Sequence, residues 1–366
     1  MNIIQTCFSK SSGGLEMAAL KMSTALRKKG HEVLALCLRN SFLGNEFSKS
    51  EIKYLSLSSN PISRLYSLKK LFKSDFDVVH THLSHDLWTL VPALNLSSNK
   101  IKLFLSKHMA SGVVKKNFLY RKLYSRVNGI FAISEFIKIN VIHTCPVSEN
   151  NVYVLPVTVP MKEFNPDLYD ITEVRKELGI DMDTITVCMT GRFTYGKGYE
   201  DFLEALPIIS GNVSHKVVFF IRGSKSRSEE DYERKLLNKI KSLPPKIDIK
   251  LIGYQENIAK FFSAVDILAF PSYEESFGSV VIEAMAMECA VVAAKNAGVT
   301  DIITHGCDGL FYPVQNIEKF AGNIIELIKN PKLRKQIGFN ARKTAIAKFD
   351  LDLLIEKYEE IYNNRS

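Results

Sequence analysis

Two glutamates, Glu275 and Glu283, lie in the segment Pro271-Ser-Tyr-Glu-Glu-Ser-Phe-Gly-Ser-Val-Val-Ile-Glu-Ala-Met-Ala286. Ser276 is the expected N-cap of a buried helix formed by the apolar run that follows it. Glu275 would then precede the helix and Glu283 would lie two turns inside it. At ~1.5 Å rise per residue, they are roughly 10 Å apart along the helix axis. This separation is too long for an acid and a base acting on one bond, but it suits the two ends of an elongated ligand.

The expected helix start between the two glutamates favours an anion. Its free backbone N–H groups and the positive end of its dipole are suited to a phosphate group. A ligand with hydroxyl groups at both ends and phosphate in the middle fits this pattern. A nucleotide sugar is such a ligand.

Two glycine-bearing loops each follow an expected strand and open a helix. The first, Ser9-Lys-Ser-Ser-Gly-Gly-Leu-Glu16, carries Gly13 and Gly14, which let backbone N–H groups approach a ligand. The second, Thr190-Gly-Arg-Phe-Thr-Tyr-Gly-Lys-Gly198, carries Arg192 and Lys197, whose charges suit phosphate. The alternatives to ligand binding are a tight structural turn for the first loop and solvated surface charge for the second. The dinucleotide fingerprint G-x-G-x-x-G is absent from the first loop, so a NAD site is not supported. The second loop lacks the order G-x-x-x-x-G-K-[ST] and is therefore not a Walker A loop.

Several histidines follow or end expected strands. The run His80-Thr-His-Leu-Ser-His-Asp86 is superficially like a metallohydrolase site, but Ser84 stands where an aspartate is needed. We therefore expect His80 and His82 to finish a strand, with one facing a cleft and the other packed. His108 follows the strand Ile101–Leu105, where a neutral imidazole is placed to donate to a sugar hydroxyl or a phosphate.

Three Asp-x-Asp pairs are the remaining candidates for metal binding. Each lies at the boundary of an expected element, where aspartate is common as a cap or turn former. We expect a structural role for all three and predict no metal site. The pairs are Asp75/Asp77, Asp181/Asp183 and Asp350/Asp352.

The elements that position these residues alternate between short apolar strands and helices. Turn signals around Pro156–Pro160 and Asn165-Pro166 divide the alternation into two series. Two βαβ series predict two doubly wound parallel-sheet (Rossmann-like) α/β domains facing a central cleft, with ligands at the carboxyl ends of the strands. We expect the first domain at 1–165, joined by a C-terminal helix over 350–366, and the second at 166–349. The expected strands lie near 2–7, 32–37, 77–80, 101–105, 129–133, 152–155, 184–190, 216–222, 247–252, 266–270, 290–294 and 309–312.

Composition limits the classes of partner. The chain has 366 residues, 46% hydrophobic and 24% charged, and a formal net charge of +9, which favours anionic partners. The N-terminus does not read as a signal peptide and no apolar run has the length of a membrane span. The six cysteines are scattered, which is typical of reduced thiols in the cytoplasm.

One basic segment could contact a membrane. Val113–Arg126 is expected as a helix that combines lysines and arginines with Phe118 and Leu119. It would either lie on an anionic membrane surface or form an ordinary amphipathic helix with a solvated face.

Taken together and in order, these motifs resemble the retaining GT-B glycosyltransferases of family four, the group 1 glycosyltransferases of bacterial surface-polysaccharide and lipopolysaccharide assembly. The resemblance covers nearly the whole chain. It rests on Gly13-Gly14, His108, Gly191-Arg192 with Lys197-Gly198, Pro271-Ser272, and the Glu275-x7-Glu283 motif with Phe277-Gly278.

The resemblance implies a role for each residue in sugar transfer from a nucleotide-sugar donor to a glycan or lipid-linked acceptor. Arg192 and Lys197 would hold the donor diphosphate in place of a metal, so no cofactor is required. Glu283 would bind the ribose hydroxyls. The transferred sugar would be held by Glu275 and the backbone at Phe277 and Gly278, with His108 beside it, while Gly13 and Gly14 would approach the donor from the other domain.

Three departures from the family pattern bear on which sugar is transferred. Glu288 and Ala290 replace a small glycine and a proline, Val157-Thr-Val-Pro160 replaces Asn-Gly-Val-Asp, and Ala297-Gly298-Val-Thr-Asp301 stands for Gly-Gly-x-x-Glu. Two other functions remain open from the sequence. One is a nucleotide-sugar epimerase of the same fold. The other is a non-catalytic binder of anionic ligands, although the basic residues lack the aromatic interleaving of a nucleic-acid surface.

Overall fold

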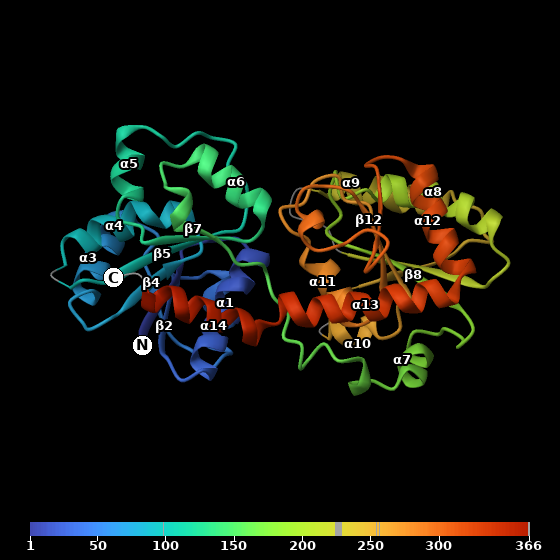
Figure 1. Ribbon diagram of the computed structural model, residues 1–366, viewed down its shortest axis with the longest axis horizontal. Coiled ribbons are helices and arrows are strands. Elements are labelled where there is room, and N and C mark those ends of the chain that lie inside the picture. The colour runs from blue at the N-terminus through green and yellow to red at the C-terminus, as the bar shows by residue number, and fades with distance from the viewer. Residues whose placement is uncertain (98, 224–228, 254, 256, 365–366) are drawn as a thin grey trace. The chain divides into compact units, whose positions relative to one another are not determined.

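A computed structural model describes residues 1–97, 99–223, 229–253, 255 and 257–364 (Figure 1). The chain forms two compact units. Unit 1 comprises Met1–Val157 with Leu351–Ser366, and unit 2 comprises Thr158–Asp350. The boundaries expected from the sequence differ: the first was expected eight residues later, at 165/166, and the second one residue earlier, at 349/350.

Unit 1 is built on a seven-stranded sheet in the order β3-β2-β1-β4-β5-β6-β7, with all neighbouring strands parallel. Parallel sheets are covered on both faces, and accordingly the central strand β4 is buried along its whole length. The strands are β1 (Asn2–Cys7), β2 (Glu32–Leu38), β3 (Lys53–Leu57), β4 (Val78–Thr81), β5 (Lys102–Lys107), β6 (Gly129–Ala132) and β7 (Val152–Val154).

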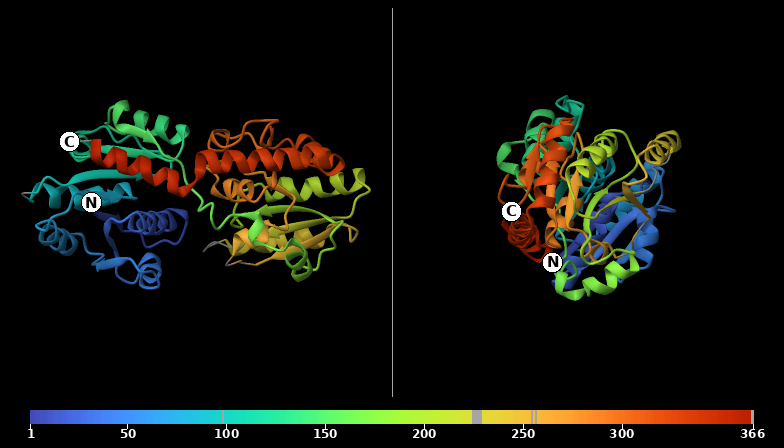
Figure 2. Two further views of the ribbon diagram at one scale, coloured as in Figure 1. Left: turned by 60° about the horizontal axis from the view of Figure 1, so that its bottom comes forward. Right: turned by 90° about the vertical axis from the view of Figure 1, so that its right-hand side faces the viewer.

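The helices of unit 1 include one from the far end of the chain. Helix α14 (Leu351–Asn364) packs beside α1 and contributes Leu354, Ile355, Tyr358 and Tyr362 to the core formed with β1, β5 and β6 (Figure 2). Side-chain caps at Ser41, Asn60, Asn117 and Ser134 begin four of the other helices. The helices before α14 are α1 (Gly14–Lys28), α2 (Phe42–Ser48), α3 (Pro61–Leu71), α4 (Leu87–Asn95), α5 (Phe118–Tyr124) and α6 (Glu135–Thr144).

Unit 2 repeats the arrangement with a six-stranded sheet in the order β10-β9-β8-β11-β12-β13, again with parallel neighbours. Its central strands β8, β11 and β12 are buried throughout. The strands are β8 (Ile185–Thr190), β9 (Val217–Arg222), β10 (Asp248–Ile252), β11 (Ile267–Phe270), β12 (Ala290–Ala294) and β13 (Leu310–Tyr312).

The helices of unit 2 pack in pairs: α8 lies against α12, and α11 lies against α13. Helix α12 covers the sheet with Phe320, Ile324 and Leu327, each fully buried. The helices are α7 (Ile171–Glu177), α8 (Tyr199–Asn212), α9 (Glu230–Lys241), α10 (Ile258–Phe262), α11 (Ser279–Ala286), α12 (Ile317–Lys329) and α13 (Pro331–Phe349).

The prediction of two doubly wound parallel-sheet domains is confirmed. Both sheets change direction of winding at one place, between β1 and β4 in unit 1 and between β8 and β11 in unit 2. In open α/β sheets, ligands bind outside the carboxyl ends of the strands at this switch point. Each unit, taken separately, therefore has one switch point at which a ligand site is expected.

Three local expectations were wrong. Helix α11 begins at Ser279 with Gly278 as N-cap, and not after Ser276, because the chain turns at Gly278 through a φ of 102° that disfavours other residues. The helix expected over Val113–Arg126 covers only Phe118–Tyr124. Strand β3 was not expected, because Lys53, Tyr54 and Leu55 are exposed at the edge of the sheet and lack an apolar run.

The family glycine that Glu288 replaces corresponds to a left-handed backbone position. Glu288 has a φ of 61°, just after the end of α11, where glycine is the usual residue. A Cβ on Gly338 of α13 would lie 2.1 Å from the Glu288 carbonyl oxygen, so α13 packs directly against this turn. Glu288 therefore replaces the family glycine while the backbone keeps the left-handed turn at this position.

Candidate functional site

Lys197 and Glu275 meet at the switch point of unit 2. Lys197 lies in the loop after β8, Glu275 lies in the loop after β11, and these strands are neighbours in the sheet. The Lys197 ammonium donates a hydrogen bond to the Glu275 carboxylate, and both side chains are about four-fifths buried. Ser272 Oγ donates to the same carboxylate oxygen at 3.2 Å. Two residues that the sequence analysis singled out separately therefore form one charged pair.

The two loops are locked together by backbone contacts that require glycine. Gly198, the N-cap of α8, has a φ of 78°, and a Cβ there would lie 2.1 Å from the Pro271 carbonyl oxygen. The Tyr273 N–H donates to the Gly196 carbonyl at 2.8 Å. The position of Lys197, between these two glycines, is consequently set by the second loop.

A third strand end supports the Glu275 loop from the other side. Asn296, which follows β12, donates through Nδ2 to the Ser272 carbonyl at 2.8 Å. A Cβ on Gly298 would lie 2.4 Å from the Glu275 carbonyl oxygen, so only glycine permits this approach. Tyr273 donates to Asp201 of α8 at 2.7 Å. The supporting roles of Tyr273, Asp201 and Asn296 were not expected from the sequence, although each residue follows a strand end or lies in the first turn of a helix.

The start of α11 places the other predicted residues of this motif. The Phe277 side chain is 3% exposed and packs edge-on against Phe349 of α13 at 5.9 Å between ring centroids, so it is a core residue. Glu283 is half-buried in the second turn of α11, closer to the helix start than expected because the helix begins later. Glu275 thus precedes the N-terminal turn of α11 in the chain, and Glu283 follows that turn.

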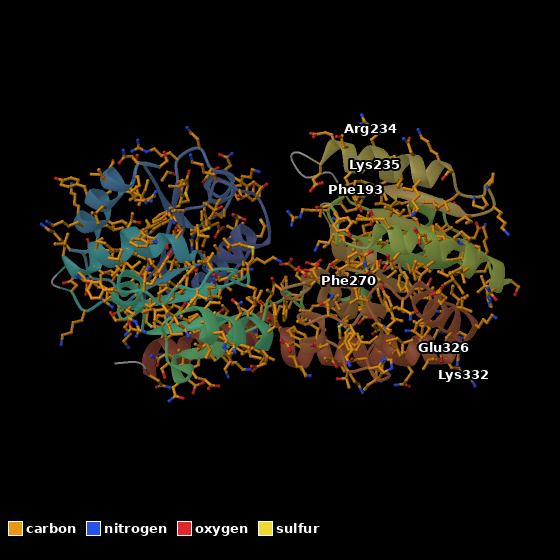
Figure 3. All side chains as sticks on the ribbon, turned by 90° about the horizontal axis from the view of Figure 1, so that it is seen from above. Phe193, Arg234, Lys235, Phe270, Glu326 and Lys332 are labelled. Carbon is orange, nitrogen blue, oxygen red and sulfur yellow. The ribbon has the colours of Figure 1, made fainter. Side chains whose placement is uncertain are left out.

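Arg192 is exposed at the carboxyl end of β8. Its neighbour Phe193, labelled in Figure 3, is buried and packs edge-on against Tyr199. Arg222 ends the adjacent strand β9 and donates to Thr190 Oγ1 at 3.1 Å. Arg222 is a further cation at this edge that the sequence analysis did not identify, although it is the last residue of an expected strand.

In unit 1, Gly13 is the N-cap of α1 and Gly14 is its first residue, and both are exposed. A Cβ on Gly14 would meet no atom within 4 Å, and one on Gly13 would meet only the Glu16 carboxylate, at 3.4 Å. Packing within the unit therefore does not explain the two glycines. Close approach of a ligand to the backbone remains the functional reading of this loop.

Three histidines, His108, His82 and His80, are in contact with one another near the switch point of unit 1. His108 follows β5, is half-buried, and its Nε2 lies 3.2 Å from His82 Nδ1. His82 Nε2 lies 2.9 Å from Gln5 Oε1 of β1. The expectation that either His80 or His82 faces a cleft was wrong, because they are 0% and 2% exposed and stack on each other.

The histidines are held neutral by their surroundings. Burial lowers the pKa of His80 to about 3, and burial together with Lys107 lowers the pKa of His108 to about 4. Burial and the two neighbouring histidines lower the pKa of His82 well below its ordinary value. At neutral pH, each of the three rings therefore has one donor and one acceptor nitrogen.

A buried carboxyl group supports the first glycine loop. Asp86 Oδ2 accepts hydrogen bonds from the Phe8 N–H at 3.0 Å and from Thr81 Oγ1 at 3.1 Å. Burial raises the pKa of Asp86 to about 7. Asp86 thus ties the chain that leaves β1 to the end of β4.

The Asp-x-Asp pairs have structural contacts. Asp77 accepts from the Asn2 N–H at 2.7 Å, Asp181 pairs with Lys216, and Asp350 forms a β-bridge with Val159. Within the described ranges, no group of three or more His, Cys, Asp or Glu side chains is arranged to hold a metal ion. In the same part of the chain, no helix combines the length and apolarity needed to cross a membrane.

Comparison with known protein families gives two matches that together span most of the chain. Residues 12–163 match the model described as Glycosyltransferase Family 4, and residues 170–344 match the model described as Glycosyl transferases group 1. The first match lies in unit 1 but for its last six residues, and the second lies in unit 2.

Characterised relatives are similar over most of their length. N-acetyl-alpha-D-glucosaminyl L-malate synthase of Bacillus anthracis is 22% identical over 98% of this chain and 95% of its own. The N,N'-diacetylbacillosaminyl-diphospho-undecaprenol alpha-1,3-N-acetylgalactosaminyltransferase of Campylobacter jejuni is 24% identical over 87% of this chain and 84% of its own.

Solved structures share the fold. A glycosyltransferase from Rickettsia africae superposes with a TM-score of 0.85 at 23% identity, over 99% of this chain and 97% of that one. Anabaena HepE, solved in complex with UDP and glucose, superposes with a TM-score of 0.84 at 19% identity over the full length of both chains. The fold, the ordered motifs and both family matches agree, and the chain belongs to the group 1, family 4 glycosyltransferases of the GT-B fold.

Proposed function

We propose that this glycosyltransferase moves a sugar from a nucleotide-sugar donor to a glycan or lipid-linked acceptor, with retention of configuration at the transferred carbon. The observation that carries the proposal is the Lys197–Glu275 pair at the switch point of unit 2. An ammonium group fixed beside a carboxylate provides one group for a phosphate and one for sugar hydroxyls at the same place. The ordinary ligand site of a doubly wound sheet is also at this edge.

Each residue of the motif has a role in this proposal. Lys197 and Arg192 bind the donor diphosphate and stabilise the negative charge that develops on it as it departs. Glu275 and the backbone at Phe277 and Gly278 hold the sugar, and Glu283 accepts hydrogen bonds from the ribose. In this arrangement Lys197 would exchange its hydrogen bond with Glu275 for the diphosphate when the donor binds.

In unit 1, Gly13, Gly14 and His108 supply the remaining contacts to the donor. The two glycines offer backbone N–H groups and His108 offers an imidazole nitrogen. No metal is assigned a part in the reaction, because the two cations of unit 2 supply the charge. Activity is therefore expected to survive a chelator of divalent cations.

The setting we propose is assembly of a cell-surface polysaccharide or lipopolysaccharide on the cytoplasmic side of the membrane. Similar proteins include a capsular polysaccharide biosynthesis glycosyltransferase of Staphylococcus aureus, 27% identical over 64% of this chain, and a lipopolysaccharide core biosynthesis glycosyltransferase of Rhizobium meliloti, 24% identical over 51% of this chain. A UDP-linked donor is the first candidate, since HepE was solved with UDP and glucose.

The test is transfer and hydrolysis of nucleotide sugars by the Lys197→Ala variant. We expect about 100-fold lower kcat or more, because a charge aimed at the developing anion is lost. Lys216→Ala is the matched control: Lys216 also pairs with a carboxylate, Asp181, but on an exposed surface at the amino end of β9. Near-wild-type activity of Lys197→Ala would refute the site, and formation of an epimer without any acceptor would identify an epimerase instead.

A second part of the proposal concerns the membrane surface. Val113, Val114, Phe118 and Leu119 are each between 56% and 77% exposed, around the start of α5. The same segment carries cations at 115, 116, 121 and 122. Exposed apolar groups ringed by positive charge suit peripheral contact with an anionic bilayer.

Liposome flotation tests this contact. We expect the protein to float with vesicles that contain anionic lipid, and to lose that association when Lys115, Lys116, Arg121 and Lys122 are replaced by glutamine. The control replaces four exposed cations of unit 2, which include Arg234 and Lys235 on α9 (Figure 3), together with Lys241 and Lys246. Equal flotation of the two variants would remove the α5 segment from the proposal.

A further inference from the structure

A buried hydrogen-bonded chain runs from the C-terminal helix to His108 within unit 1. The Tyr362 hydroxyl of α14 lies 2.6 Å from His80 Nδ1. Gln5 Nε2 lies 3.5 Å from the same nitrogen, and Gln5 Oε1 lies 2.9 Å from His82 Nε2. His82 Nδ1 then lies 3.2 Å from His108 Nε2. All members of this hydrogen-bonded chain except His108 are at most 2% exposed. The direction of each hydrogen bond is therefore set by the neighbouring protein groups.

The distance at the first link defines the donor. Hydrogen bonds from N–H groups to oxygen span about 2.7–3.2 Å, whereas those from O–H groups extend down to about 2.5 Å. The 2.6 Å between the Tyr362 hydroxyl oxygen and His80 Nδ1 therefore favours the Tyr362 O–H as the donor and His80 Nδ1 as the acceptor. The proton of the neutral His80 ring then lies on Nε2, which is 2.8 Å from Ser106 Oγ.

The remaining links follow from that first one. Because His80 Nδ1 accepts, the amide group of Gln5 presents its N–H to His80 and its oxygen to His82. His82 must donate from Nε2 to that oxygen, so its Nδ1 has no proton. The hydrogen bond between His82 Nδ1 and His108 Nε2 is then donated by His108.

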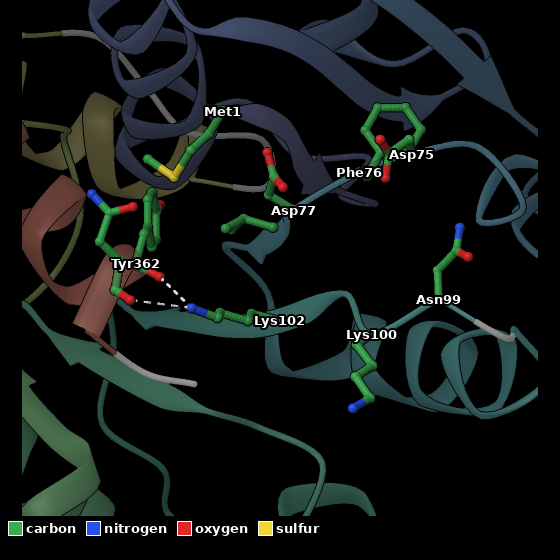
Figure 4. A pocket seen from close by; sticks show the side chains of 10 residues that line it. Met1, Asp75, Phe76, Asp77, Asn99, Lys100, Lys102 and Tyr362 are labelled. Carbon is green, nitrogen blue, oxygen red and sulfur yellow. Dashed lines mark hydrogen bonds between the residues drawn. The ribbon is translucent and has the colours of Figure 1, made fainter.

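Tyr362 is anchored by its backbone as well as by its hydroxyl group. Lys102 Nζ donates to the Tyr362 carbonyl at 2.9 Å and to the Asn363 carbonyl at 3.3 Å, beside the amino ends of β1, β4 and β5 (Figure 4). The Tyr362 ring packs on Phe104 with 4.9 Å between centroids. The phenol is therefore held in the core of unit 1 from both sides.

We infer that Tyr362, through His80, Gln5 and His82, sets the tautomer of His108 so that Nε2 carries the proton and Nδ1 is an acceptor. Tyr362, His80, Gln5 and His82 are positioning residues in this arrangement. No hydrogen bond to His108 Nδ1 occurs among the residues that the structure describes. The C-terminal helix thus contributes to the site without reaching it.

The consequence for binding rests on the proposed function. An Nδ1 acceptor takes a hydrogen bond from a hydroxyl group of the transferred sugar, whereas it cannot donate to a phosphate oxygen. From the sequence alone, His108 was expected to donate to a sugar hydroxyl or to a phosphate. The buried hydrogen bonds instead make Nδ1 an acceptor, so its expected contact is a hydrogen bond from a sugar hydroxyl.

The direct test is the tautomer of His108, measured by long-range proton–nitrogen NMR correlation on protein labelled with nitrogen-15 at its 8 histidines. The His108→Gln variant assigns the signal. We expect the Nε2–H pattern for His108 in the unliganded wild type. We expect a shift toward the other tautomer or a mixture in Tyr362→Phe, which removes only the hydroxyl group that orients the chain.

Tyr358→Phe is the matched control on the same helix. Its hydroxyl group is also buried but bonds to Ser106, which contacts His80 at Nε2 and does not lie between Tyr362 and His108. We expect this variant to keep the wild-type His108 tautomer. An Nδ1–H pattern in the wild type, or the same tautomer in Tyr362→Phe as in the wild type, would overturn the inference. Neither result requires activity, so the proposed function would be unaffected.

A double-variant cycle connects the chain to the reaction. We expect Tyr362→Phe to lower kcat/KM for the donor by about two- to tenfold, the range for one hydrogen bond. In the His108→Ala background, the same substitution should have no further effect. An equal loss in both backgrounds would show that Tyr362 acts only on stability and would contradict its role through His108.

Discussion

Lys197 and Glu275 hold each other in place before any ligand is present. Gly196 and Gly198 flank the lysine, and Ser272 adds a hydrogen bond to the carboxylate, so the pair is held by both loops. An ion pair that is mostly buried depends on both partners, because removal of one leaves the other charge uncompensated. The functional and structural roles of these two residues are therefore coupled.

Glu275→Gln is expected to lower kcat by at least about tenfold, because the sugar loses a charged hydrogen-bond acceptor and Lys197 loses its partner. Thermal unfolding should also shift to lower temperature, because Lys197 is left with an uncompensated, mostly buried charge. Glu274→Gln is the control, because Glu274 is the exposed neighbour in the same loop. Equal activity of the two variants would show that Glu275 does not contact the sugar.

Several residues of the site were predictable because they are next to buried strands in the sequence. Gly13, Lys197 and His108 each follow an apolar run closely, and the carboxyl ends of parallel strands are the usual place for a ligand site. The chain from Tyr362 to His82 was not predictable. Its members come from β1, β4, the position just after β4, and α14, and only the register of the sheet and the packing of the last helix bring them together.

At the scale of elements, helix α14 completes the core of unit 1. Ile355 is fully buried, and Leu354, Tyr358 and Tyr362 are at most 4% exposed. The strands were mostly predictable from apolar runs, because most of them are fully or largely buried. Strand β3 and the short helix α5 were not predictable in this way. Their residues are largely exposed, so their sequences lack the apolar pattern that marks a buried element.

Ile355→Ala is expected to destabilise unit 1 by about 2–5 kcal/mol, the usual cost of a cavity left by a large buried side chain. Trp88, the single tryptophan, lies in α4 of unit 1, so its fluorescence during urea denaturation reports this unit. Leu353→Ala is the control, because Leu353 is 46% exposed on the same helix. A similar urea midpoint for both variants would show that α14 does not contribute to the core.

At the scale of the whole molecule, buried ionisable groups make stability depend on pH. His80 and His108 have folded-state pKa values of about 3 and 4, below the unfolded value near 6.5. Between these values the unfolded chain binds more protons, so stability falls as the pH falls from about 6.5 to 4. Asp86 acts in the opposite sense. Its folded-state pKa of about 7 lies above the unfolded value of 3.8, so it favours the folded state as the pH falls.

We expect the histidines to dominate, because burial lowers the pKa of three of them, whereas burial raises the pKa of two carboxyl groups, Asp86 and the less deeply buried Asp201. Each group contributes at most about 1.4 kcal/mol per pH unit. The urea midpoint followed by Trp88 should therefore fall between pH 6.5 and pH 4.5. Asp86→Asn should make this fall steeper, because one opposing group is removed. A shallower fall in Asp86→Asn would show that Asp86 is ionised in the folded protein.

The central claim, a nucleotide-sugar site built around Lys197 and Glu275, is tested most directly by thermal unfolding with a panel of nucleotide sugars. A ligand that binds only the folded state, present at 100 times its dissociation constant, stabilises by about 2.7 kcal/mol. We predict that at least one nucleotide sugar raises the Tm of the wild type and of Lys216→Ala, and that it has little effect on Lys197→Ala. If no nucleotide sugar raises the Tm of the wild type, or if Lys197→Ala responds as the wild type does, the account is contradicted.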